Sequence, residues 1–257
     1  MKKLIMKKLI HLLIALCFIS SAWASVSFVS GSSVSNGSNY TVQLPSMSQT
    51  AGDYVIIIAS WCANSSCNAS TSSDTVTISD TAGNTTYYST ALLRFNASTC
   101  CAIAIYCGAV NTTASNQITW TNSPTSTQYL DVDAFEVSGA APCASILDSA
   151  VTNTNYTASM TTASSPLVLA GAGGTSANNE LAYSVCNWRP SAYPSGWTGI
   201  QNSYNYDAYE AITTSGTTPS ASWPFTSTQT LAATAIIALK PPTGGSTVRH
   251  RAMVIQQ

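Results

Sequence analysis

The sequence predicts an all-β protein, an antiparallel two-sheet β-sandwich, and three of its features support this. Short segments rich in Val, Ile, Thr and Tyr recur along the chain, whereas helical periodicity is almost absent. Turn signals such as Asn36-Gly37 and Ser215-Gly216 separate these segments. Charged residues make up only 7% of the chain, and Ser, Thr, Asn and Gly supply the polar surface instead. Many short strands with such turns are typical of a sandwich or barrel.

The predicted strands cover both parts of the chain. They are residues 25–30, 39–44, 53–61, 74–79, 85–95, 101–110, 116–121 and 128–139, followed by 165–173, 180–188, 206–214, 220–225 and 230–240. Residues 55–58 and 234–239 are apolar at both alternating positions, which predicts central strands that are covered on both faces.

Motifs recur in the same order in the two parts, which predicts an internal duplication. The aligned pairs are 52–57 with 165–170, Gly83 with Gly196, Tyr106 with Tyr209, Trp120 with Trp223, and Phe135 with Ile237. Each half has an apolar face that it cannot bury alone. We therefore expect the halves to stack face to face around a core about 10 Å thick.

The N-terminal segment has the features of a signal peptide. Four lysines precede an apolar run, and Ala22-Trp23-Ala24 gives the small-x-small pattern of a cleavage site. The run is shorter than the roughly 20 residues of a membrane span. We expect a signal peptide at 1–24, a β-sandwich domain at 25–241 with halves near 25–140 and 141–241, and a linker and tail at 242–257. Cleavage near Ala24 predicts a secreted, extracellular or cell-surface protein without a membrane span.

The expected mature chain is acidic. Four of the nine Lys and Arg residues lie in the signal segment, so five basic and ten acidic residues remain. Such a chain lacks the basic surface that neutralises phosphates. We therefore expect no nucleic-acid partner.

Cysteine usage is typical of an oxidising compartment. The disulfide candidates are Cys62, Cys67, Cys101, Cys107, Cys143 and Cys186. Cys62 and Cys67 bracket a polar loop and can close a hairpin, whereas Cys101 and Cys107 lie too far apart on one strand to pair with each other. The connectivity stays open at this point, and the odd number of seven after cleavage predicts at least one free or intermolecular thiol.

The residue types exclude most catalytic machinery from the domain. After the signal segment the only histidine is His250, in the tail, so no Ser-His-Asp or Cys-His nucleophile and no histidine-ligated metal is expected inside the domain. Carboxylates remain, and a glycosidase requires two of them. The candidates are Asp131, Asp133, Glu136, Glu180, Asp207 and Glu210. Asp131 and Asp133 share one strand face and are also candidate calcium ligands; otherwise no cofactor is expected.

Aromatic residues give the candidate ligand patch. Six residues in and after a proline-rich segment form it: Trp188, Arg189, Tyr193, Trp197, Tyr204 and Tyr206. Exposed rings stack on sugars, and the alternative is that these rings cover one end of the sandwich.

The order of motifs resembles a widespread group of bacterial and phage exported β-sandwich proteins of unassigned activity. The matching segments are AGDYVIIIASW, ISDTAGNTTY, AIAIYCGAV, DVDAFEVSG, SPLVLAGAG, PSGWT and ATAIIALKP, over about residues 26–241. The resemblance implies a lectin-like jelly-roll sandwich and defines no catalytic residue.

These observations favour a secreted, non-enzymatic structural or adhesion-type protein. Low charge weakens the usual protection of strand edges against pairing, so copies of the chain are expected partners. The alternative is a carbohydrate-binding module with glycan partners. A third hypothesis is a polysaccharide-acting enzyme that uses carboxylates.

Overall fold

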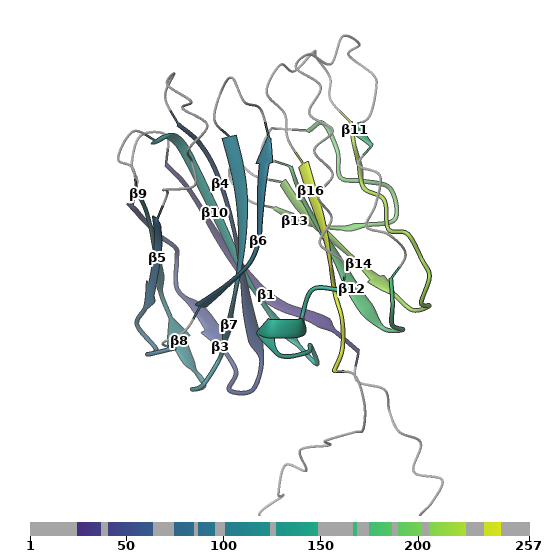
Figure 1. The fold of residues 1–257 in the computed structure, drawn as a ribbon, viewed down its shortest axis with the longest axis horizontal. Coiled ribbons are helices and arrows are strands. Elements are labelled where there is room, and N and C mark those ends of the chain that lie inside the picture. Colours follow the sequence, from purple (N-terminus) through teal and green to yellow (C-terminus); the bar gives the residue numbers. More distant parts are fainter. Residues whose placement is uncertain are drawn as a thin grey trace, which may run out of the picture. The chain divides into compact units, whose positions relative to one another are not determined.

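The computed structural model describes residues 25–36, 41–63, 75–84, 87–95, 101–123, 127–148, 167–168, 175–186, 190–201, 206–224 and 234–242. Residues Ser25–Thr243 form one compact unit. The predicted signal peptide and C-terminal tail lie outside the described residues. The described parts consist of strands and one short 3-10 helix, η2 (Cys143–Ser145), which confirms the all-β prediction (Figure 1). The described residues contain no helix that is long and apolar enough to cross a membrane.

Two large antiparallel sheets form the framework. The five-stranded sheet has the order β1 (Ser27–Asn36), β10 (Thr127–Ser138), β4 (Tyr54–Ala63), β7 (Cys101–Ala109) and β6 (Tyr87–Phe95). The four-stranded sheet has the order β13 (Thr198–Gln201), β14 (Tyr206–Ile212), β12 (Glu180–Cys186) and β16 (Thr234–Leu239).

Three smaller sheets accompany them. One has the order β2 (Thr41–Gln43), β9 (Ile118–Ser123) and β5 (Thr75–Asp80). The others pair β3 (Met47–Gln49) with β8 (Ala114–Asn116), and β11 (Leu167–Val168) with β15 (Ser222–Trp223).

Strand β4 shows how the sequence pattern produces the layers. Successive side chains of a strand point to opposite faces, and Ile56 and Ile57 are both fully buried. Ile56 packs in a cluster with residues of the four-stranded sheet, whereas Ile57 packs in a different cluster with Trp120 of β9. Both faces of the five-stranded sheet are therefore covered, as the run of apolar residues predicts.

Among the residues that the structure describes, three hydrophobic clusters hold the sheets together. The central cluster lies between the two large sheets, where Phe135 and Tyr183 stack with ring centroids 3.9 Å apart. The first outer cluster contains Trp120 and lies on the other face of the five-stranded sheet. The second outer cluster contains Trp223 and Ala182 and lies on the other face of the four-stranded sheet.

The two-sheet expectation is therefore incomplete. The large sheets do pack face to face, but short strands cover a second face of each of them. Figure 1 shows β5 and β9 on one side of β4 and β10, and β12 and β14 on the other side.

The two large sheets share a strand order. β10-β4-β7-β6 in one corresponds to β16-β12-β14-β13 in the other. Trp120 lies opposite Val42 in β2, and Trp223 lies opposite Leu167 in β11. Common descent of the two halves stays a prediction, to which this order adds support.

The strand order corrects the details of the predicted alignment. β12, not residues 165–170, occupies the position of β4. β12 lies between β16 and β14, as β4 lies between β10 and β7. Gly52 and Asn179 precede these two strands and both have positive φ, 97° and 62°. The predicted match of 52–57 with 165–170 therefore does not follow this correspondence of strand order.

Candidate functional site

The predicted aromatic patch is only partly described; of its described rings, Trp197 is buried and Tyr193 and Tyr206 are half-buried. Trp197 is 9% exposed, and its indole Nε1 donates a hydrogen bond to the Ser220 carbonyl at 3.2 Å. Tyr193 is half-buried, and its ring lies 6.1 Å from that of Trp223 and 5.7 Å from that of the half-buried Tyr206. Trp188, Arg189 and Tyr204 lie outside the described residues.

A glycine explains how Tyr193 packs inward. A Cβ atom at Gly199 would lie 2.5 Å from the Tyr193 ring, so the absence of a side chain lets the ring lie against β13. Tyr87 covers Gly108 in the five-stranded sheet in the same way. Trp197 therefore belongs to the second outer cluster, and the half-buried Tyr193 packs against it.

The predicted calcium ligands lie at the boundary of the two large sheets. Asp133 is 2% exposed, and Asp131 is half-buried. Asp133 shares the strand face of Phe135 and so faces the four-stranded sheet. Burial, then the charges of Asp207 and Asp133, raise the pKa of Tyr183. The structure thus places both Asp133 and Asp207 near Tyr183, although in the described segments no three His, Cys, Asp or Glu residues form a metal-binding group.

Glu136 and Glu210 are two further candidate carboxylates on strands of the large sheets. Glu136 is fully buried and accepts a hydrogen bond from the Thr50 backbone N–H at 2.6 Å. Burial raises its pKa, and the neighbouring Asp53 raises it further. Glu210 is half-buried, and burial raises its pKa too. Buried acids such as Glu136 and Asp133 cannot flank a glycosidic bond in the conformation described, since a substrate must reach both carboxylates.

The structure brings together a further group of titratable residues. Of these, only Glu180 is a candidate from the sequence. Asp148 follows η2, Glu180 begins β12, and Lys240 follows β16. The Lys240 Nζ lies 3.7 Å from Asp148 Oδ1, and the Asp148 side chain is 2% exposed. Ser176 donates hydrogen bonds from its backbone N–H and its hydroxyl to the two Asp148 oxygens. We call these residues the Asp148 cluster.

Glu180 is the acid of the Asp148 cluster whose pKa is raised. It is 1% exposed, and its Oε1 accepts a hydrogen bond from the Ala177 N–H at 2.7 Å. Burial, followed by the neighbouring Asp148 carboxyl, raises the pKa of Glu180 to about 7. Two carboxyls in contact and one amine are thus gathered in a largely buried site.

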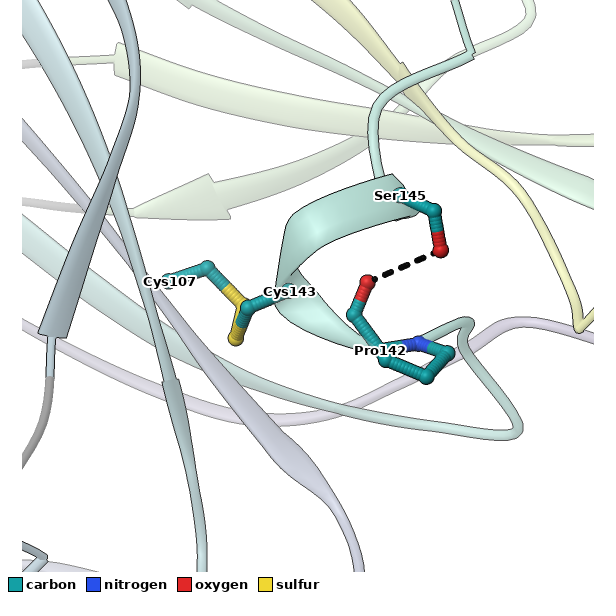
Figure 2. The surroundings of a disulfide bond; sticks show 4 residues. All are labelled: Cys107, Pro142, Cys143 and Ser145. Atoms are coloured by element: carbon teal, nitrogen blue, oxygen red, sulfur yellow. Dashed lines mark hydrogen bonds between the residues drawn. A yellow bond between two sulfur atoms is a disulfide. The ribbon is translucent and has the colours of Figure 1, made fainter.

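Two of the six candidate cysteines, whose pairing the sequence leaves open, form a disulfide. Cys107 of β7 is bonded to Cys143 of η2 with a Cα–Cα separation of 5.4 Å (Figure 2). Both residues belong to the central cluster. Ser145 Oγ donates a hydrogen bond to the Pro142 carbonyl at 3.3 Å and closes the same turn. Cys62 and Cys101 face each other in the β4–β7 register, and Cys67 lies outside the described residues.

Strand β1 is an outer strand of the five-stranded sheet, and it contains neither a charged residue nor proline. Val29 is the only large apolar side chain with high exposure in the described part of the chain, at 46%. The register of β1 with β10 shifts between Phe28 and Ser30, and Val29 is the residue of β1 that has no partner position in β10. Among the residues that the structure describes, β10 is the only strand paired with β1. β1 is therefore a candidate association edge.

Comparison of the sequence with protein-family models, with curated proteins and with solved structures finds no significant match.

Proposed function

We propose that the mature chain is an exported, non-enzymatic structural or adhesion-type protein that associates with copies of itself. The observation that carries the proposal is the β1 edge, ten residues long and without charge or proline. Edge strands offer unpaired backbone groups to another strand, and natural proteins usually protect such edges with Lys, Pro, a β-bulge or a covering segment. β1 has a register irregularity at Val29 but neither Lys nor Pro.

A second copy is the partner that this edge fits best. Two β1 strands can pair antiparallel about a two-fold axis, and each then supplies the same surface to the other. The small Ser and Gly side chains of β1 permit close approach, and the acidic excess of the chain does not oppose pairing there because β1 carries no charge. Backbone pairing between edges provides affinity, and exposed apolar residues such as Val29 add to it.

The carbohydrate-binding alternative has less support. It depends on exposed aromatic rings, whereas Trp197 is buried and Tyr193 packs against Gly199 and Trp223. The disulfide and the all-β fold agree with an extracellular structural protein. The resemblance to exported β-sandwich proteins is consistent with the same proposal.

The test is sedimentation of residues 25–257, expressed in an oxidising compartment, over a range of concentrations. We expect association that grows with concentration in the wild type, is lost in Val29→Lys and persists in Thr218→Lys, which adds the same charge in an exposed loop. A wild-type protein that stays monomeric at high concentration would overturn the proposal. Equal association of the two variants would overturn the role of β1 and leave self-association in place.

A further inference from the structure

The Asp148 cluster contains more buried acid than an ion pair needs. Asp148 and Glu180 interact through their carboxyls, and a single amine, Lys240 Nζ, lies 3.7 Å from Asp148 Oδ1. Within the described part of the molecule, Glu180 Oε2 is buried and has no hydrogen-bond partner. A structural ion pair does not require this second carboxyl, and burying it without a partner is unfavourable.

The backbone fixes the amine and the acid beside each other. Leu147 and Leu239 form an antiparallel bridge. On its two sides Asp148 N–H donates to the Ala238 carbonyl at 3.0 Å, and Lys240 N–H donates to the Ile146 carbonyl at 2.9 Å. Asp148 and Lys240 are thus diagonal neighbours across a short ladder, which holds their side chains on the same side.

We propose that Lys240 Nζ and Asp148 Cγ become joined by an intramolecular isopeptide bond that forms in the folded protein, with Glu180 transferring the proton. This inference does not depend on the proposed self-association. It assigns to the Asp148 cluster a covalent modification in which the protein is both substrate and catalyst.

The reaction balances without an external reagent. The ammonium of Lys240 and the carboxylate of Asp148 condense to an amide and one water molecule. In the attacking form Nζ is neutral and the Asp148 carboxyl carries a proton. Nζ then bonds to Cγ, Glu180 accepts a proton from the nitrogen, and it returns a proton to the hydroxyl that leaves as water. Glu180 ends in the state in which it began.

The surroundings of Asp148 suit this step. The Ser176 N–H donates to Asp148 Oδ2 and the Ser176 hydroxyl donates to Oδ1. One of these donors therefore contacts the oxygen that stays as the amide carbonyl and can stabilise the negative charge that develops on it. Asp148 and Glu180 are almost completely buried, which limits the water available for the reverse hydrolysis. The amine and the acid are held together before the reaction, which lowers its entropic cost.

The test is the intact mass of the mature protein after reduction, alkylation and denaturation. We expect the wild type to be lighter by one water molecule than its sequence with all cysteines alkylated, which is the reference mass for every variant. A proteolytic fragment should contain Lys240 and Asp148 in cross-linked form. Lys240→Arg should have its full sequence mass, because the guanidinium is not a nucleophile here. Glu180→Gln should also have its full mass, although Gln keeps the acceptor for Ala177 N–H.

Asp148→Asn provides a positive control, since loss of ammonia from the Asn variant gives the same product as loss of water from the wild type. A wild-type protein with the full mass of its sequence would overturn the proposal. Water loss that persists in Lys240→Arg would also overturn it, because the loss would then arise elsewhere. Circular dichroism of each variant establishes that a full mass comes from a folded protein.

Discussion

We expect Glu136 to make the stability of the folded protein depend on pH. Burial and Asp53 raise its pKa above the ordinary 4.5, so the folded state binds this proton more tightly than the unfolded state does. The contribution of Glu136 to the free energy of unfolding should therefore be fully present below pH 4.5. It should be lost as the pH rises through the raised pKa of Glu136.

Glu136→Gln tests this dependence because it keeps an oxygen acceptor for the Thr50 N–H and removes the charge. We expect the variant to lose the part of the pH dependence above pH 4.5 that belongs to Glu136. Urea unfolding from acid to neutral pH measures this. Parallel curves for the variant and the wild type would mean that Glu136 does not titrate differently in the two states.

Gly199 is the second residue whose role follows directly from geometry. Gly199→Ala places a methyl group 2.5 Å from the Tyr193 ring, so either the ring or β13 has to move. We expect a loss of about 1–3 kcal/mol of stability, as for other overpacked interiors. Thr198→Ala, at the exposed preceding position of β13, is the matched control and should lose much less. Chemical denaturation of both variants decides between them.

Among the elements, the link between β7 and η2 depends on the disulfide. Cys107 and Cys143 lie in the central cluster and connect a central strand to the segment that follows β10. Replacing both by Ala should lower the stability by about 2–4 kcal/mol, mainly because the unfolded chain gains freedom. Thermal unfolding measures this loss. The secondary structure should stay intact, and a variant as stable as the wild type would show that the bond adds nothing.

The elements also differ in how far the sequence predicted them. The long strands β4, β7 and β10 were expected from their apolar residues and their turns. β3 and β8 were missed because each has only three residues and is largely polar, and their strand conformation depends on pairing with each other, as between Met47 and Asn116. β13 was missed because TGIQ has no alternation long enough to detect.

At the scale of the whole molecule, the central cluster joins the two halves. Phe135 of the five-stranded sheet stacks on Tyr183 of the four-stranded sheet. Phe135→Ala should cost about 3–5 kcal/mol, as expected for a large buried aromatic ring. Both halves should lose stability together, and hydrogen exchange in β9 and in β14 provides the measurement. Faster exchange confined to the first half would contradict a shared core.

The candidate sites were harder to predict than the fold class. Residue type alone placed Tyr193 and Trp197 in a binding patch, but whether a ring is exposed depends on partners such as Gly199 and Ser220 that lie elsewhere in the chain. Asp148 lies in none of the recognised motifs, and it is far in sequence from Lys240 in the closing ATAIIALKP segment. Only the bridge between Leu147 and Leu239 brings them together.

The shared central cluster has a consequence for biosynthesis. A chain is made from its N-terminus, so β1 to β10 exist before the strands of the four-stranded sheet have been synthesised. During that interval Ile56, Phe135 and Val137 have no sheet to cover them. The nascent first half therefore needs a chaperone or rapid completion of the chain, and early termination yields a product that aggregates rather than a working half-protein.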